Sequence, residues 1–91
     1  MASVTIGGPV LSTEPGGMQP GRSHDWTWDL GGSTMRAVSV AVDPLSNNTV
    51  LAVANLRFVV AADRKRTIAF TVTNVGAQAT NYGVSVGVIQ P

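Results

Sequence analysis

The chain has 91 residues, of which 44% are hydrophobic and only 12% are charged, and its formal net charge is +1. This length suits one domain with one core, and the near-neutral charge excludes the basic field that concentrates nucleic acid or anionic lipid. Cysteine is absent from the sequence, which excludes disulfide bonds and thiolate metal sites.

Turn-forming residues interrupt the first third of the chain. Glycine and proline cluster at residues 7–9, 14–17 and 19–21, and such clusters end regular elements. Short edge strands are expected at residues 4–6 and 10–12, since proline is tolerated at sheet edges. The N-terminus lacks the basic and apolar segments of a signal peptide, and no run approaches the roughly 18 apolar residues of a membrane span. We expect a soluble domain without membrane insertion; a secreted protein after signal-peptide removal would look the same.

Residues 23–30 alternate in character and predict a strand with two distinct faces. One face carries His24, Trp26, Trp28 and Leu30. The other face carries Asp25, Thr27 and Asp29.

Four further strands are expected at residues 36–42, 49–60, 67–74 and 82–88. The second of these is too long for one flat strand, so a bulge is expected at Ala54 and Asn55. Beyond that bulge, the side chains of Leu56, Phe58 and Val60 are expected to face inward.

Apolar residues recur at every second position throughout, and β-branched residues dominate these runs. Strands at this spacing, separated by turn signals, are typical of an antiparallel sandwich. The sequence therefore predicts an all-β protein: one antiparallel β-sandwich domain, residues 1–91, of about seven short strands.

The last third carries a familiar pattern. Strand 56–60, a charged turn, and residues 66–76 with their Val-x-Asn-x-Gly ending resemble bacterial immunoglobulin-like modules of the CARDB type. Residues 82–86 match the strand that follows in those modules, and residues 20–23 match their Pro-Gly-x-Ser strand entry. The resemblance implies an immunoglobulin-like sandwich with an adhesion or interaction role.

The sequence contains few of the residue groupings that catalysis requires. His24 is the sole histidine, and its neighbour Asp25 points to the opposite face of the strand, so the two cannot form a triad. No Gly-x-Ser-x-Gly elbow occurs, and the five carboxylates are spread along the chain. We expect a protein that is not an enzyme and has no metal site and no cofactor.

Two tryptophans on one strand face form the best candidate for ligand binding. Trp26 and Trp28 would lie roughly 7 Å apart and present a flat apolar ladder on which a sugar stacks. Polar groups that complete this candidate site are Arg22, His24, Asp25 and Asp29. The alternative is that the indoles supply bulk to the core, as tryptophan commonly does in sandwiches.

Two strands carry small, uncharged residues on the face opposite their valines. These residues are Ala37, Ser39, Ala41, Gly83, Ser85 and Gly87. A smooth face of this kind allows close approach without ordering long side chains. We therefore predict a homo-oligomer, and a non-catalytic binding or structural module that self-associates through this face. The alternative is a small carbohydrate-binding lectin; a protein or a glycan is the expected partner.

Overall fold

Runs of β-branched residues at two-residue spacing form six strands and no helix in residues 3–30 and 36–90, the part that the computed structural model describes. Within these residues no helix is long and apolar enough to span a membrane. The strands are β1 (Ser3–Leu11), β2 (Ser23–Asp29), β3 (Arg36–Pro44), β4 (Leu51–Val60), β5 (Arg66–Asn74) and β6 (Tyr82–Gln90).

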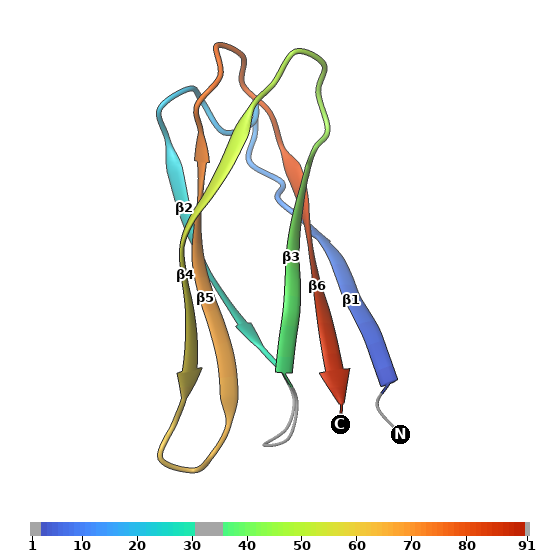
Figure 1. Cartoon of the computed structure of the whole chain (residues 1–91). Helices are drawn as coiled ribbons and strands as arrows, with labels where there is room; N and C mark the ends of the chain where they lie inside the picture. Colours follow the sequence, from blue (N-terminus) through green and yellow to red (C-terminus); the bar gives the residue numbers. More distant parts are fainter. Residues whose placement is uncertain (1–2, 31–35, 91) are drawn as a thin grey trace.

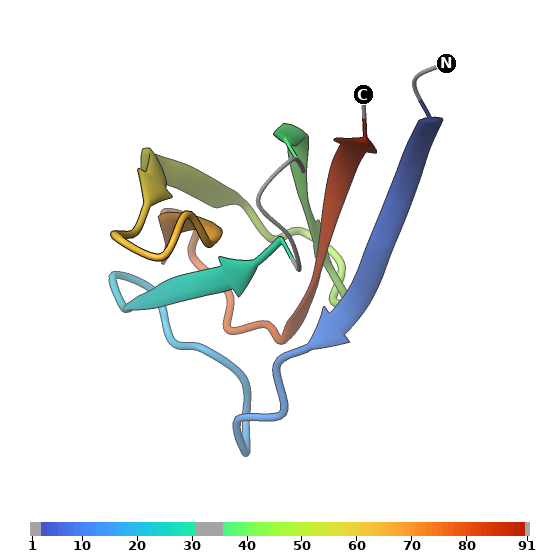
Figure 2. The same ribbon diagram turned by 90° about the horizontal axis from the view of Figure 1, so that it is seen from below.

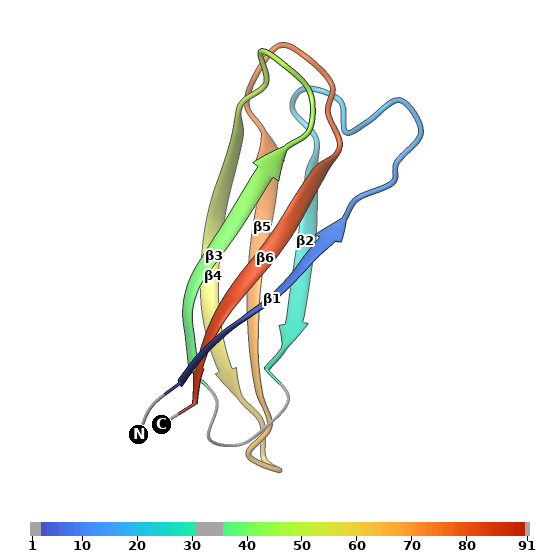
Figure 3. The ribbon, with the colours of Figure 1, turned by 90° about the vertical axis from the view of Figure 1, so that its right-hand side faces the viewer.

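The strands form two antiparallel sheets, ordered β1-β6-β3 and β2-β5-β4. Figure 1 shows the two sheets facing each other, with both chain termini at the same end. Seen from the side in Figure 3, the strands of both sheets run along the same long direction. The prediction of an all-β antiparallel sandwich is confirmed.

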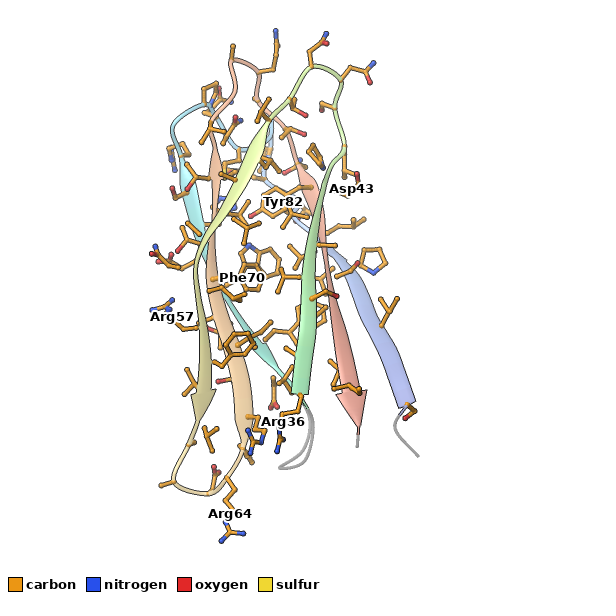
Figure 4. The ribbon with its side chains drawn as sticks, viewed as in Figure 1. Arg36, Asp43, Arg57, Arg64, Phe70 and Tyr82 are labelled. Carbon is orange, nitrogen blue, oxygen red and sulfur yellow. The ribbon has the colours of Figure 1, made fainter. Side chains whose placement is uncertain are left out.

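The core lies between the central strands, β5 and β6. Every second residue of β5 from Ile68 to Asn74 is buried, as two-residue alternation requires of a strand covered on one face. Phe70 and Tyr82 point into the space between the sheets in Figure 4. The buried apolar residues are Met18, Leu30, Ile68, Phe70, Val72, Tyr82, Val84 and Val86.

The N-terminal region forms one strand rather than the two short strands that were predicted. β1 runs through Pro9 because its register against β6 shifts between Gly7 and Val10, which absorbs the irregularity. β1 is an edge strand, where proline costs no ladder hydrogen bond on the solvent side.

Strand β3 differs from the prediction at Ala37, which was expected on the outer face. The pairing register with β6 shifts between Ala37 and Ser39, so one residue is inserted and the alternation changes phase. Ala37 is consequently half-buried and packs against the core. The side chain of Val38, expected to face inward, lies outside the described part of the structure.

Strand β4 also differs from the prediction. The bulge appears as expected, between Ala54 and Arg57, with Asn55 at a φ of 56°. Phe58 pairs with buried Ile68 and so shares its inward face, yet Leu56, Phe58 and Val60 are 46%, 65% and 54% exposed. The expected inward direction is thus found, but the three side chains are not buried, because the opposing sheet does not cover this edge. Figure 2 shows β4 at the outside of its sheet.

The loops at residues 12–22, 45–50 and 75–81 gather at one end of the sandwich (Figure 1). Buried asparagine and threonine side chains join these loops. Asn74 bonds to the Met18 and Gln78 carbonyls, and Thr80 accepts a hydrogen bond from the Ser46 N–H. This end of the molecule is therefore a single hydrogen-bonded unit, in contrast to the uncovered β4 edge.

Candidate functional site

The two tryptophans of the predicted sugar platform point into the sandwich from β2. Both are half-buried and pack against the core. Trp26 lies parallel to Phe70, with ring centroids 6.3 Å apart and planes 2° from parallel, and it meets Tyr82 edge-on at 6.0 Å. Trp28 lies against β1, where a Cβ on Gly7 would stand 3.1 Å from the indole. Both indoles therefore contribute to packing between the sheets.

A hydrogen-bonded series of polar side chains begins at Trp26. Its indole N–H donates to the Tyr82 hydroxyl at 2.9 Å; that oxygen lies 2.6 Å from His24 Nδ1, and His24 Nε2 lies 3.1 Å from Glu14 Oε2. An ionised carboxylate only accepts, so Nε2–H donates to Glu14, while the direction of the bond between the Tyr82 hydroxyl and Nδ1 depends on the tautomer and protonation of His24. Each of these polar atoms therefore has a partner within the protein.

Carboxylate, imidazole and hydroxyl follow one another here in the order of a nucleophilic triad. However, Tyr82 has no exposed surface (0%), so its hydroxyl does not meet a substrate. Burial raises the pKa of the Tyr82 phenol above its ordinary value of 10.0; the Trp26 hydrogen bond lowers this pKa and the Glu14 charge raises it further. A buried phenol that keeps its proton is a poor nucleophile. The series instead ties β2, β6 and the loop of Glu14 together.

Phenylalanine in place of Tyr82 is expected to lower the free energy of unfolding by about 1–2 kcal/mol at neutral pH, because Trp26 and His24 lose their partner.

In the wild-type protein the unfolded chain releases the phenol proton near pH 10.0, while the folded chain holds it to higher pH. Stability is therefore complete below that pH and falls as the pH rises through the folded-state pKa. Urea unfolding between about pH 8 and 11 measures this fall, which Tyr82→Phe should lack; an unchanged alkaline slope would contradict the assignment.

The acidic residues of the predicted sugar site lie on the other face of β2. Asp25 and Asp29 are exposed there, and Asp25 accepts a hydrogen bond from the Thr71 hydroxyl at 2.8 Å. Arg22 is also exposed and precedes the strand, and its carbonyl accepts from the Asn74 N–H at 3.0 Å. Since successive side chains of a strand point to opposite faces, the six predicted residues do not converge on one ligand.

The predicted self-association face is only partly accessible. Gly83 is buried because side chains of the neighbouring strand β1 cover it: a Cβ there would stand 3.2 Å from the Leu11 side chain and 3.4 Å from the Pro9 side chain. Gly87, which pairs with Ile6 of β1, is buried as well. Ala37 is half-buried against the core, so the members that remain exposed or half-buried on this face are Ser39, Ala41 and Ser85. Self-association through this face stays a prediction.

A different apolar surface lies on β4. We call Leu56, Phe58 and Val60 the β4 stripe; they share the inward face of their sheet but are left uncovered. Beside the stripe is a cavity of about 160 Å³ between β4 and β3. Its lining is mainly apolar, with two arginines, and comprises Leu30, Arg36, Ala37, Phe58, Val59, Val60, Arg66 and Thr67.

A second, more open cavity of about 340 Å³ lies at the loop end of the sandwich. Backbone and short polar side chains line much of it, and several already bond to one another. Thr80 donates to the Asn81 carbonyl at 2.6 Å and accepts from the Ser46 N–H at 3.2 Å, while Asn81 bonds to the backbone of Glu14. These groups hold the loops together and leave little unmet polar capacity for a ligand.

Among the described residues, no group of three His, Cys, Asp or Glu side chains lies close enough together to hold a metal ion. Compared with known proteins, the chain matches no family model, no curated protein and no solved structure. The resemblance to CARDB-type immunoglobulin-like modules therefore stays a prediction.

Sequence reasoning missed Glu14 and Tyr82 as partners of His24, and it missed the exposure of the β4 stripe. The inward position of His24 was a usable signal, since a buried polar group needs a partner. Which loop supplies that partner depends on how the sandwich closes. Nothing in the sequence indicated the exposure of β4, because a strand has the same alternation of apolar residues whether or not another sheet covers it.

Proposed function

We propose that this protein is a non-catalytic binding or structural module that takes up another polypeptide chain along the free edge of β4. The observation that carries the proposal is the exposure of the β4 stripe on a strand that, within residues 3–30 and 36–90, pairs with β5 alone. Strand addition uses both features: main-chain hydrogen bonds supply affinity, and alternate side chains supply specificity.

The second half of strand β4 has little of the usual protection of a sheet edge. Natural edges are blocked by charge, by proline, by β-bulges or by short length. β4 is ten residues long, contains no proline and carries a single charged residue, Arg57, which Figure 4 shows pointing away from the sandwich. The bulge near Asn55 interrupts its first half. Residues 56–60 are therefore the segment best suited to pairing with an incoming strand.

The cavity beside the stripe supports the same proposal. Its volume of about 160 Å³ suits one apolar side chain, and it opens next to Phe58, which is 65% exposed. A strand added to β4 would present every second side chain to this side of the sheet. One of those side chains would then have an apolar site to enter, which is the arrangement of an anchor residue in an interface.

The sugar-binding alternative has less support. A sugar platform needs an indole face and nearby hydrogen-bonding groups free to meet hydroxyls. Here the indole N–H of Trp26 and both ring nitrogens of His24 are engaged within the protein, and one face of Trp26 lies along Phe70. Asp25 and Asp29 lie on the opposite face of the sheet.

Panning a displayed library of random dodecamer peptides tests the proposal. Phe58→Lys should lose binding without loss of folding, because Phe58 is largely exposed. The matched control is Val75→Lys, which changes another exposed apolar residue, at the loop end. We expect peptides with apolar residues at alternate positions to be enriched on the wild type and on Val75→Lys, but not on Phe58→Lys. Equal enrichment on all three proteins, or none, would overturn the proposal.

A further inference from the structure

The backbone around the 61–65 turn determines which groups of β4 face its free edge. The Ala61 N–H donates to the Lys65 carbonyl at 2.9 Å, across the β4–β5 hairpin. One residue further, the Arg66 carbonyl accepts from the Leu30 N–H at 3.0 Å, on the opposite side of β5. Val60 lies opposite Arg66. The N–H and C=O groups of Val60 therefore point away from β5, toward the free edge.

This orientation alternates along an antiparallel strand. Arg57 and Val59 direct their main-chain groups to β5, whereas Phe58 directs its groups to the free edge, as Val60 does. The residues whose backbone is available for pairing are thus the same residues whose apolar side chains are uncovered. An incoming strand would hydrogen-bond to these main-chain groups and cover these apolar side chains at the same time.

We propose that the occupant of this edge is a second copy of the chain, paired antiparallel through β4 about a two-fold axis at Phe58; this inference rests on the proposed function. In this register Phe58 pairs with Phe58 of the second copy, and Leu56 pairs with Val60 in both directions. The two sheets join into one continuous six-stranded sheet. Each residue of the β4 stripe then lies opposite a residue of the β4 stripe in the second copy.

The pattern of side chains favours this self-pairing. An axis at Arg57 would set two arginines directly opposite each other, which is unfavourable. With the axis at Phe58, Arg57 lies opposite Val59 of the second copy, on the outer face of the sheet. No like charges stand directly opposite each other, and the apolar residues of the segment are complementary to themselves, as a two-fold interface requires.

The expected association is weak. A contact through five residues of one strand buries less than the roughly 800 Å² per partner of a standard interface. We therefore expect a dissociation constant in the micromolar range or above, so that dimers form at high local concentration. Sedimentation velocity at concentrations from about 5 to 500 μM covers this range.

Charge substitutions at Val59 test the register. Val59 is exposed and should tolerate them. Val59→Glu places a carboxylate opposite Arg57 of the second copy at two symmetric positions, which should tighten the dimer about two- to thirty-fold. Val59→Lys should weaken it by a similar factor. As controls, Ala54→Glu and Ala54→Lys lie on the same outer face but beyond the paired segment, and both should leave the dissociation constant unchanged.

Each alternative has a distinct result. Weakening by both Val59→Glu and Val59→Lys would move the axis to Val59 and overturn the register proposed here. Equal effects at Val59 and Ala54 would overturn strand pairing. A wild-type monomer at every concentration would overturn the second copy as occupant. The peptide panning described above, done at low protein concentration, decides the proposed function independently of that result.

Spin labels on single cysteines locate the contact directly, because the chain has no cysteine of its own. In the proposed dimer, Arg57→Cys positions are diagonal neighbours, with Cα atoms about 7–8 Å apart. Ala41→Cys reports on the small-residue face of the other sheet. We expect short label-to-label distances for Arg57→Cys and long distances for Ala41→Cys. The reverse result would replace the β4 edge with the small-residue face.

Discussion

Alanine in place of Asn74 is expected to remove about 3 kcal/mol from the free energy of unfolding, a large share of the stability of a small domain. The Asn74 side chain is fully buried at the loop end. Its Nδ2 donates to the Met18 carbonyl at 2.9 Å and to the Gln78 carbonyl at 2.8 Å, and its Oδ1 accepts from the Gly76 N–H at 3.0 Å. Alanine removes one hydrogen bond from each of three main-chain groups, and of these the Met18 carbonyl keeps only the bond from the Thr80 N–H at 3.2 Å and belongs to a fully buried residue. Urea unfolding followed by circular dichroism measures the loss.

Two further variants make this prediction specific. Asn47→Ala makes the same chemical change at an exposed turn position and should alter stability by less than about 0.5 kcal/mol. Asn74→Asp keeps an acceptor for Gly76 but sets a negative charge against the carbonyls of Met18 and Gln78. It should therefore destabilise at least as strongly at neutral pH and recover in acid, where the protonated carboxyl donates again. A loss below about 1 kcal/mol for Asn74→Ala would mean that water replaces the side chain.

The alternation of residues in β5 and β6 was enough to predict the sandwich and much of its core. Ile68, Phe70 and Val72 are buried as their spacing required, and so are Val84 and Val86. Periodicity of this kind depends only on the pleat of each strand. It also placed the two tryptophans on one face of their strand.

Coverage by another sheet is a different property, and periodicity does not report it. Leu56, Phe58 and Val60 have the same alternation as Ile68 and Phe70, yet they remain exposed because β4 is the edge of its sheet. Sheet order depends on how distant strands pair, which local spacing does not encode.

Register shifts were equally hidden from the sequence. One inserted residue between Ala37 and Ser39 turned Ala37 toward the core. A one-residue slip reverses the face of every following side chain, so a face predicted from spacing fails wherever a bulge occurs. For the same reason, the predicted small-residue face lost a member.

The contacts of His24 show which part of a site cannot be predicted from the sequence. Its inward direction followed from the strand, but Glu14 reaches it from a loop and Tyr82 from the opposite sheet. Both partners become neighbours only after the sheets close. The same closure separated Asp25 and Asp29 from the aromatic residues with which they had been grouped.

Alanine at Gly17 is expected to cost about 3 kcal/mol or more, because two costs coincide at this residue. Its φ of 80° lies in the left-handed region, where a side chain costs roughly 1–2 kcal/mol. In addition, a Cβ would stand 2.9 Å from the backbone N and C atoms of Thr80, closer than van der Waals contact allows. Thr80 cannot retreat without breaking its two hydrogen bonds with Met18, at 2.8 and 3.2 Å, and Met18 is a core residue.

The neighbouring glycine separates these two costs. Gly16 has a similar φ of 77°, but the nearest atom to a Cβ there is the Gln19 amide nitrogen at 4.0 Å. Gly16→Ala should therefore carry the conformational cost alone, about 1–2 kcal/mol by urea unfolding. The difference between the two variants measures how firmly Thr80 and Met18 hold the loop against the core. Equal losses of unfolding free energy in the two variants would mean that the loop moves aside at no cost. A difference of 1 kcal/mol or more would mean that the hydrogen bonds between Thr80 and Met18 hold the loop rigidly against the core.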